Sequence, residues 1–243
     1  MLQQDERLDY LPNKQLKIIQ AEDVFSFSID AVLLAKFVSV PIQKGKLIDL
    51  CTGNGIIPLA LSERTKGKIY GVELQKRLYD MAVRSVEENE LSERLSMIHS
   101  DINKLPNEML NESFDVVTCN PPYFESFSKT EQNLNEFIAF ARHEIACTLD
   151  DVIRIGSRLV KQKGKVALVH RPERLSDMIE CMRKYRLEPK RVQFIYPKAG
   201  KEANIVLLEG MKDGKKGLKC LPPLFVYGDD GAYTKDFSEV YHG

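Results

Sequence analysis

The stretch most informative about chemistry is Asn120-Pro121-Pro122-Tyr123, at the end of the apolar run FDVVTCN. Two consecutive prolines fix φ and lack N–H donors, so this segment is stiff. The Asn120 side-chain oxygen and the Pro121 carbonyl can accept hydrogen bonds from an NH₂ group, and the Tyr123 ring can stack on a planar group. Two such acceptors favour the pyramidal geometry that a planar amine needs for nucleophilic attack. A rigid turn with an exposed aromatic residue is the structural alternative.

A second group of residues, LIDLCTGNG, leads from an apolar run through Gly53-Asn54-Gly55 into a segment of helical character. Backbone amides at the end of a strand and the start of a helix can bind a polar ligand, and glycine permits close approach. Glu73 ends the next apolar run, 20 residues after Gly53, where its carboxylate can accept hydrogen bonds from ribose hydroxyls. An ordinary strand-to-helix turn is the alternative.

Two classes of nucleoside cofactor fit such a turn. A dinucleotide site expects GxGxxG, but Pro58 occupies the third glycine position. Asp49, four residues before Gly53, would repel a pyrophosphate, whereas its carboxylate can bind the ammonium group of a methionine. The pattern therefore favours S-adenosylmethionine as the cofactor.

An acidic residue followed by a Gly-x-Gly turn resembles the first motif of class I methyltransferases. The resemblance implies that the segment from Asp49 to Gly55 binds the methionine and sugar, that Glu73 binds the ribose, and that Asp101 accepts from the adenine amine beside Ile102. Asp101 equally fits the N-cap of a turn. The residues expected to bind the cofactor are Phe25, Ser28, Asp30, Asp49, Cys51, Gly53, Asn54, Gly55, Glu73, Leu74, Asp101, Ile102 and Asn120.

The run Asn120-Pro121-Pro122-Tyr123 resembles the [Asn/Asp/Ser]-Pro-Pro-[Tyr/Phe/Trp] signature of adenine N6, cytosine N4 and glutamine N5 methyltransferases. These four residues are therefore the expected catalytic residues. The signature does not choose among the three amines.

Longer stretches of the sequence narrow the choice among these three classes of methyltransferase. FSFSIDAVLLA (25–35), NPPYF (120–124) and ARHE (141–144) resemble the bacterial N6-adenine methyltransferases that act on adenine 37 of a valine tRNA, and the resemblance spans roughly residues 15–210. It implies a tRNA substrate and places Phe25, Ser28 and Asp30 over the methionine end of the cofactor. Alternatively, the phenylalanines pack inward and Ser28 or Asp30 caps a helix.

Charge is unevenly distributed along the chain. Residues 181–220 hold eleven Lys or Arg against four Asp or Glu, interleaved with Tyr185, Phe194 and Tyr196, although the last two share strand parity and equally fit a core. Such a region can bind an RNA backbone and stack an unpaired base. The substrate-contact candidates are Phe124, Arg142, Lys198 and Lys201, and a solvated helix charge is an equal alternative for Arg142.

The elements that must position these residues are short apolar runs alternating with helical segments, which indicates βαβ units. The expected strands are residues 46–50, 68–73, 95–100, 114–120, 165–170, 191–197 and 204–210. Only KAGKEA separates the last two, so they form an antiparallel hairpin. The predicted fold is an α/β, Rossmann-like class I methyltransferase fold. It has a seven-stranded, mostly parallel twisted sheet with that hairpin at its C-terminal end and helices on both faces.

The chain is expected to form one methyltransferase domain, residues 1–243, in which residues 1–40 are an N-terminal extension over the cofactor and substrate site. This extension is predicted to contain a short hairpin or loop at 14–29 and a helix beginning near Asp30. A helix pair is expected at 133–160. The tail, 218–243, shows no clear period.

Bulk properties exclude several classes of protein. Lys plus Arg and Asp plus Glu both total 35, so no global positive field indicates a nucleic-acid partner. The five cysteines lack metal-ligand spacing, so no metal site is expected. No apolar run is long enough to span a bilayer and no signal-peptide core is present, so we expect a cytoplasmic protein without membrane contact.

Three alternatives to a tRNA methyltransferase remain. Glutamine N5 methyltransferases usually carry a helical domain before the sheet, and DNA adenine methyltransferases a target-recognition domain, whereas about 45 residues precede the first sheet strand here. A non-catalytic RNA-binding protein on this scaffold is opposed by the intact glycine turn and proline motif.

Overall fold

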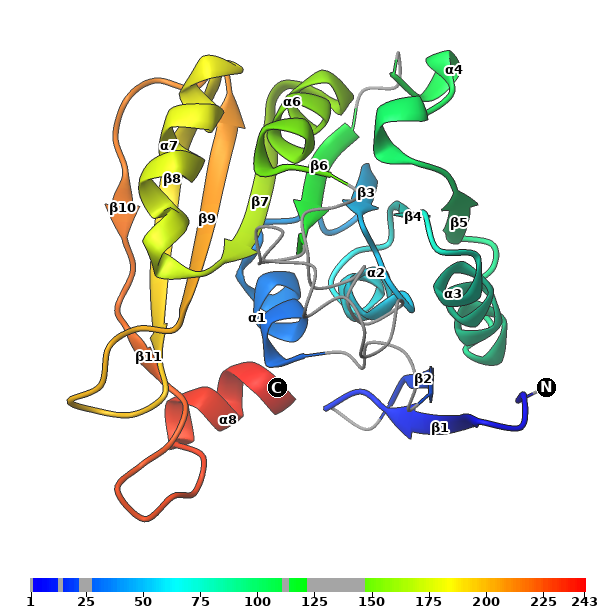
Figure 1. Ribbon diagram of the computed structural model, residues 1–243, viewed down its shortest axis with the longest axis horizontal. Helices are drawn as coiled ribbons and strands as arrows, with labels where there is room; N and C mark the ends of the chain where they lie inside the picture. Colours follow the sequence, from blue (N-terminus) through cyan, green and yellow to red (C-terminus); the bar gives the residue numbers. More distant parts are fainter. Residues whose placement is uncertain (1, 13–14, 22–27, 111–113, 122–146) are drawn as a thin grey trace, which may run out of the picture.

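The computed structural model describes residues 2–12, 15–21, 28–110, 114–121 and 147–243. One sheet runs through the centre of the molecule (Figure 1), and it contains a strand at each of the seven predicted positions. These strands are β3 (Lys46–Leu50), β4 (Lys68–Glu73), β5 (Leu95–His99), β6 (Phe114–Cys119), β7 (Val160–His170), β8 (Leu187–Tyr196) and β9 (Ile205–Lys212). Two short strands, β10 (Lys219–Cys220) and β11 (Leu224–Phe225), pair with β8 and extend the sheet at that edge.

The strand order places the two loops of interest side by side. The seven strands follow the order β8-β9-β7-β6-β3-β4-β5. Strands β3 to β7 are mutually parallel, and β9 is antiparallel to both β7 and β8, which confirms the predicted hairpin. From β3 the chain proceeds to β4 on one side and returns as β6 on the other. The carboxyl ends of β3 and β6 therefore form a topological switch point, where ligands bind in sheets of this kind.

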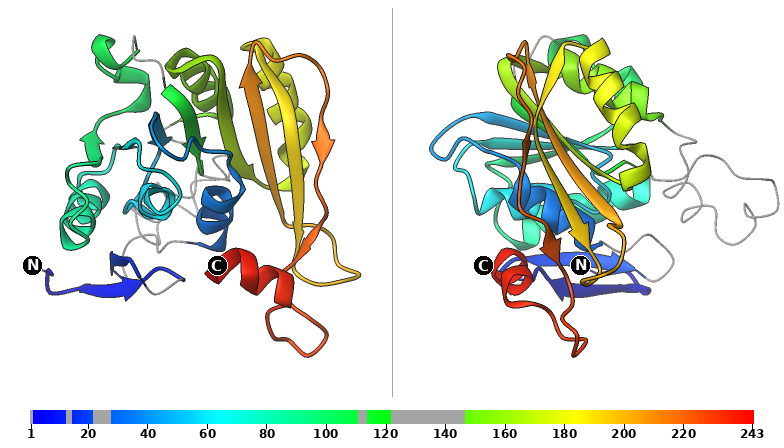
Figure 2. Two further views of the ribbon diagram at one scale, coloured as in Figure 1. Left: turned by 180° about the vertical axis from the view of Figure 1, so that it is seen from behind. Right: turned by 90° about the vertical axis from the view of Figure 1, so that its left-hand side faces the viewer.

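Helices cover both faces of the sheet (Figures 1 and 2). One face carries α1 (Ile29–Phe37), α2 (Ile56–Ser62) and α3 (Lys76–Glu88), and the other carries α4 (Asn107–Leu110), α6 (Leu149–Leu159) and α7 (Leu175–Lys184). Short 3₁₀ turns, η1 (Ile102–Lys104) and η2 (Pro172–Arg174), follow β5 and β7. Alternating strand residues supply the two cores: Leu47 and Val116 pack with the α1 and α2 side chains, while Ile48 and Val117 pack with those of α6. Of the helix pair predicted at 133–160, α6 is present, and residues 133–146 lie outside the described residues.

Helix α1 begins where the sequence predicted, near Asp30, and is buried on nearly all sides. Ala31 to Ala35 are each at most 2% exposed. The helix packs against α2, β7, β9 and α8 (Lys235–His242). A short helix that is apolar all around needs such a surrounding because no face of it favours water.

The N-terminal hairpin lies earlier than predicted. It consists of β1 (Glu6–Tyr10) and β2 (Lys17–Ala21), so of the hairpin or loop expected at 14–29 only the second strand falls in that range, and residues 22–27 lie outside the described residues. Strand β2 packs on α3, and its Ile19 N–H donates to Ser85 Oγ at 3.0 Å. The partner strand ERLDY is mostly polar and only partly buried, so it carries no apolar alternation that would mark it in the sequence.

The tail, whose residues show no clear period, is ordered by packing against the domain. Its helix α8 buries Phe237 completely and contacts α1 and β11. The Thr234 hydroxyl caps this helix by accepting from the Phe237 N–H at 3.1 Å. Within the described ranges, no helix is both long and apolar enough to cross a membrane.

Candidate active site

The switch point between β3 and β6 brings together the two motifs that stand far apart in the sequence. Leu50 of β3 is the register partner of Cys119 of β6. The glycine turn after Leu50 and the Asn120-Pro121 step after Cys119 therefore leave the same edge of the sheet from neighbouring strands. This juxtaposition is what a reaction between a cofactor and an amine requires.

The glycine turn adopts a backbone that most residues cannot. Cys51, Gly53 and Gly55 have φ of 56°, 58° and 90°. A Cβ on Gly55 would approach Ala82 Cβ at 3.2 Å, whereas a Cβ on Gly53 would meet nothing within 4 Å. Gly53 thus exposes its backbone to open space, as a turn that receives a ligand should. Asn54 is used differently, because its side-chain Nδ2 donates to the Ile19 carbonyl at 3.1 Å and so ties the turn to the N-terminal hairpin.

Glu73 lies beside the turn, as its spacing predicted. Its Oε2 accepts from the Gly53 N–H and its Oε1 from the Gln75 N–H, both at 2.8 Å. The side chain is 6% exposed, and burial raises the pKa of Glu73 although these backbone donors act in the opposite direction. Each carboxylate oxygen has a further lone pair, so Glu73 can hold the turn and still accept a hydroxyl of a ligand. Leu74, the next residue, is 37% exposed.

Asp49 is the most deeply buried acid of the site. Thr118 Oγ1 donates to its Oδ1 at 2.6 Å, while its Oδ2 is buried without a hydrogen-bond partner in the described structure. Burial raises the pKa of Asp49 to about 7, and the negative charge of Glu73 adds to this effect. A buried acceptor without a partner is costly unless a ligand supplies a donor.

Asp101 serves as a cap. Its Oδ1 accepts from the Asn103 N–H at 2.9 Å, which begins the η1 turn, and Lys104 Nζ lies 3.8 Å from Oδ2. Ile102 is 5% exposed. The capping interpretation of Asp101 is therefore confirmed, and an additional contact between Asp101 or Ile102 and an adenine ring stays a prediction.

Two predicted residues lie at the start of α1. Ser28 occupies the N-cap position, yet its side chain makes no capping hydrogen bond, and its Oγ is buried without a partner among the described residues. Asp30 lies in the first helical turn, where a negative charge favours the helix. Ser28 is thus available for a role other than capping.

Asn120 and Pro121 are the described residues of the proline motif. They follow β6 directly, and Pro121 is buried. The predictions made for Phe25, Pro122, Tyr123, Phe124 and Arg142 lie outside the described residues.

Three thiols lie together at the site. The sequence placed Cys51 in the cofactor turn, but it did not indicate that two further cysteines join it, because the three are 28 or more residues apart. Cys51 Sγ lies 3.6 Å from Cys147 Sγ, and Cys119 interacts with Cys51. The Cys119 thiol and burial raise the pKa of Cys51, and burial raises the pKa of Cys119 to about 11. Both thiols are therefore protonated at neutral pH and are poor nucleophiles. No group of side chains in the described ranges has a metal-binding arrangement.

Four of the eleven basic residues of the region 181–220 form ion pairs within the protein. Arg183, Lys184, Arg186 and Arg191 form ion pairs with Glu188, Asp150, Asp213 and Glu209. The aromatic residues are also used internally: the Tyr185 hydroxyl donates to Asp150 Oδ2 at 2.5 Å, and the Tyr196 ring packs on Phe225. Part of the positive charge of this region is therefore neutralised within the protein.

Lys198 and Lys201 differ from those residues. Both are exposed in the turn between β8 and β9. Because β8 runs in the same direction as β7, this turn lies at the edge of the sheet where β3 and β6 end. These two lysines are thus on the same edge as Asn120.

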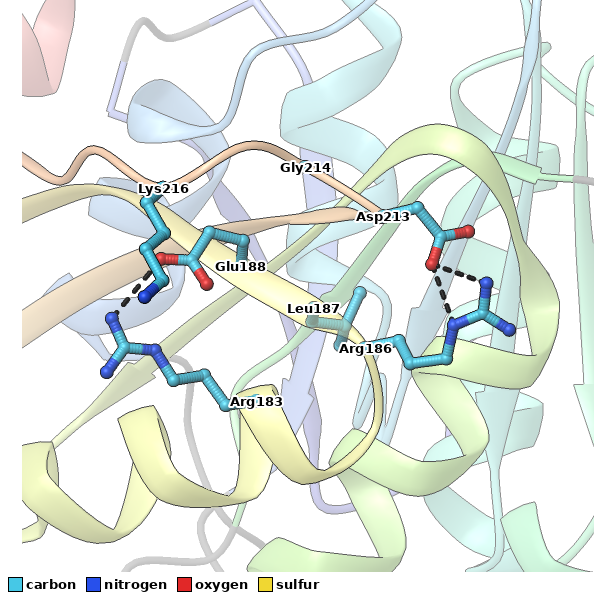
Figure 3. A pocket seen from close by; sticks show the side chains of 7 residues that line it. All are labelled: Arg183, Arg186, Leu187, Glu188, Asp213, Gly214 and Lys216. Carbon is cyan, nitrogen blue, oxygen red and sulfur yellow. Dashed lines mark hydrogen bonds and ion pairs between the residues drawn. The ribbon is translucent and has the colours of Figure 1, made fainter.

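A hollow of about 360 Å³ lies elsewhere, beside the start of β8 (Figure 3). It is lined by Arg183, Arg186, Leu187, Glu188, Asp213, Gly214 and Lys216. Because Leu187 begins β8, this hollow lies at the edge opposite the glycine turn, and its two arginines already pair with the carboxylates that Figure 3 shows beside them. It does not belong to the candidate active site.

The fold is that of methyltransferases. The structure resembles that of a predicted O-methyltransferase from Agrobacterium tumefaciens, with a TM-score of 0.70 and 23% identity over 88% of this chain and 95% of that one. The family model of the methyltransferase small domain matches residues 15–148. The chain belongs to this family.

Curated relatives extend over nearly the whole chain. The tRNA1(Val) (adenine(37)-N6)-methyltransferase of Photobacterium profundum is 26% identical over 92% of each chain. The protein of the same name from Flavobacterium psychrophilum is 22% identical over 95% of this chain and 96% of its own.

Proposed function

We propose that this protein is an S-adenosylmethionine-dependent methyltransferase that modifies the N6 amine of adenine in a tRNA, at the position named for its relatives, adenine 37 of tRNA1(Val). One observation carries the proposal. The acidic glycine turn and the Asn120-Pro121 step leave neighbouring strands at the switch point, so cofactor and target amine would meet between them. A tRNA substrate also implies that the protein works in the cytoplasm.

The residues present fit the cofactor. Asp49 Oδ2 is a buried acceptor that lacks a partner within the described part, which suits the methionine ammonium group, and the open space before Gly53 admits a ligand against the backbone. Glu73 would accept hydrogen bonds from ribose hydroxyls, with Asp101 and Ile102 at the adenine. When bound, the cofactor supplies an electrophilic methyl group on a sulfonium.

The residues of the proline motif would act on the amine. The Asn120 side-chain oxygen and the Pro121 carbonyl would accept the two N6 hydrogens, which directs the nitrogen lone pair away from the ring and stabilises positive charge on the nitrogen. Tyr123 would stack on the extruded base, and an unpaired loop base is easier to extrude than a paired one. Lys198 and Lys201, with Phe124 and Arg142, would contact the RNA.

We also propose that residues 1–243 act as one methyltransferase domain in which residues 1–40 cover the site. The hydrogen bond from Asn54 to the hairpin residue Ile19 supports this arrangement, since it attaches the N-terminal segment directly to the glycine turn.

The test is methyl transfer from labelled cofactor into unmodified tRNA, with digestion of the product to nucleosides. We expect label in N6-methyladenosine, and in valine tRNA before other tRNAs. Transfer into a protein glutamine instead would refute the RNA assignment, and cofactor binding without transfer to any substrate would favour a non-catalytic protein.

The role of Asn120 gives a second test. Asn120→Ala should lower kcat roughly 10²- to 10³-fold, because one of two acceptors for the amine is removed. The dissociation constant of S-adenosylhomocysteine, measured by calorimetry, should stay unchanged. If cofactor affinity falls as far as kcat, Asn120 binds the cofactor rather than activating the amine.

A further inference from the structure

Thr118 connects the two halves of the candidate site. It lies on β6, two residues before Asn120, and its register partner on β3 is Asp49. Its hydroxyl donates to Asp49 Oδ1 at 2.6 Å, and both residues have no exposed surface. The strand that carries the catalytic motif is therefore joined, side chain to side chain, to the acid of the cofactor motif.

This hydrogen bond distinguishes the two oxygens of one carboxylate. Oδ1 is held by Thr118, whereas Oδ2 makes no hydrogen bond of normal geometry in the described ranges. The Thr52 hydroxyl acts on the carboxylate from nearby, but it too is buried without a hydrogen bond of normal geometry, so Oδ2 can accept from a ligand. A carboxylate that is fixed through one oxygen presents the other in a defined direction, which reduces the entropy lost when a ligand binds.

The hydroxyl also affects the charge of Asp49. Burial raises its pKa to about 7, the charge of Glu73 raises it further, and the hydroxyls of Thr118 and Thr52 lower it. The Cys119 thiol beside it is protonated because burial raises its pKa to about 11. No cation acts on Asp49 within the described part of the chain, so hydroxyl groups are what favour its ionised form.

We propose that Thr118 is a positioning residue that orients Asp49 so that Oδ2 receives the primary ammonium group of the cofactor's methionine part. This inference rests on the proposed function, since it assumes that the cofactor carries such a group. Thr118 itself touches neither cofactor nor substrate.

The experiment compares two ligands on Thr118→Val. S-adenosylhomocysteine contains the amino acid part, whereas 5′-methylthioadenosine keeps the nucleoside and lacks the ammonium group. By calorimetry above pH 7, the variant should bind S-adenosylhomocysteine about tenfold more weakly, the effect of removing one buried hydrogen bond to a charged group. The affinity for 5′-methylthioadenosine should remain that of the wild type.

The pH profile gives a second readout that needs no catalysis. Wild-type affinity for S-adenosylhomocysteine should fall as the pH falls through about 7, because protonated Asp49 no longer attracts an ammonium ion. Removing the Thr118 donor raises the pKa of Asp49, so the variant should lose affinity at a higher pH. Thr118→Ser, which keeps the hydroxyl, should restore both the affinity and the wild-type profile.

A matched control is Thr65→Val. Thr65 is also a buried threonine, 3% exposed, and its hydroxyl donates to the Pro41 carbonyl away from the site. Its replacement should lower thermal stability without changing either affinity. If Thr118→Val does not fold, Thr118→Cys replaces it, since a thiol of similar size is a weak donor and should produce the same selective weakening.

Three results would overturn the inference while leaving the proposed cofactor in place: wild-type affinity in Thr118→Val, equal weakening of both ligands, or an unshifted pH profile. If the wild-type protein bound neither ligand, the proposed function itself would fail. The two failures are thus distinguishable.

Discussion

Two of the buried acids, Asp49 on β3 and Glu209 on β9, have very different surroundings. Glu209 is 2% exposed and accepts from the Ser39 N–H at 2.8 Å and from an Arg191 guanidinium nitrogen at 3.3 Å. Asp49 has no exposed surface, and the Thr118 hydroxyl donates to one of its oxygens while the other has no described partner. Both are acids inside a sheet, but among the described residues only Glu209 has a cation beside it.

The difference indicates what each acid is for. A buried carboxylate is costly unless hydrogen bonds or a positive charge compensate it. Glu209 is compensated within the chain, and it fastens β9 to Ser39, just after α1, so its role is structural. Asp49 lacks this compensation, which is expected where a ligand supplies the positive charge. The same kind of side chain thus anchors the fold in one place and, under the proposed function, binds the cofactor in the other.

The largest expected effect is the pH dependence of stability that Asp49 causes. Burial raises its pKa to about 7 from 3.8, so the folded protein takes up a proton more readily than the unfolded chain. The penalty of the buried charge is fully present above pH 7 and is relieved as the pH falls toward 3.8. The free energy of unfolding of the wild type, relative to Asp49→Asn, should therefore rise by about 4 kcal/mol over this interval.

Urea denaturation of both proteins across this range measures the effect, and their difference cancels the titration of all other groups. Saturating S-adenosylhomocysteine should reduce the pH dependence, because its ammonium group compensates the carboxylate. A difference between the two proteins that does not change with pH would mean that Asp49 is as well compensated as Glu209.

A smaller effect is expected at the structural acid. Glu209→Gln removes a buried charge next to Arg191 and disturbs the bonds to Ser39, so the free energy of unfolding should fall by about 3 kcal/mol. The affinity for S-adenosylhomocysteine should stay the same. Asp49→Asn should do the reverse, with weaker binding of S-adenosylhomocysteine and no such loss of stability. Chemical denaturation and calorimetry on the two variants provide this cross-comparison. Reduced affinity in Glu209→Gln would show that the two regions are coupled.

The smallest effect is expected on tRNA binding, from the turn between β8 and β9. Replacing both Lys198 and Lys201 by alanine should weaken tRNA binding and lower the slope of log affinity against log salt by about 1 for each phosphate that the protein no longer binds. A double alanine variant of Lys66 and Lys68, exposed at the opposite edge of the sheet, makes the same charge change and should leave the slope unaltered. Equal slopes in both variants would remove this turn from the RNA interface.

Much of the fold was predictable because its strands have local signals. The runs at 46–50 and 68–73 match β3 and β4 to the residue, since apolar β-branched side chains stop abruptly at polar turns. Strands β7 and β8 begin earlier than expected, at Val160 and Leu187, where lysines and a proline interrupt the apolar pattern. The polar strand β1 and the tail helix α8 depend on the surfaces they pack against.

The motifs of the site could be predicted from the sequence, but the hydrogen bonds and ion pairs between distant residues could not. The spacing from Gly53 to Glu73 correctly anticipated that the two residues meet. The sequence did not indicate that the Asn54 side chain binds the Ile19 carbonyl, and a contact between Asn54 and the cofactor stays a prediction. Net charge in residues 181–220 suggested a basic surface, but ion pairs such as Lys184 with Asp150 join residues 34 apart, which a local count of charge does not reveal.

The glycine turn, the acid at its side, the proline motif and the order in which strands carry them could all be recognised in the sequence, because each depends on residues close together in the chain. The sequence could not show which buried acid is compensated by a positive charge, since this depends on tertiary packing. Asp49 and Thr118 are 69 residues apart, and Glu209 and Ser39 are 170 apart. Whether a carboxylate is neutralised depends on which distant strand lies beside it, and that is set by the folding of the whole sheet.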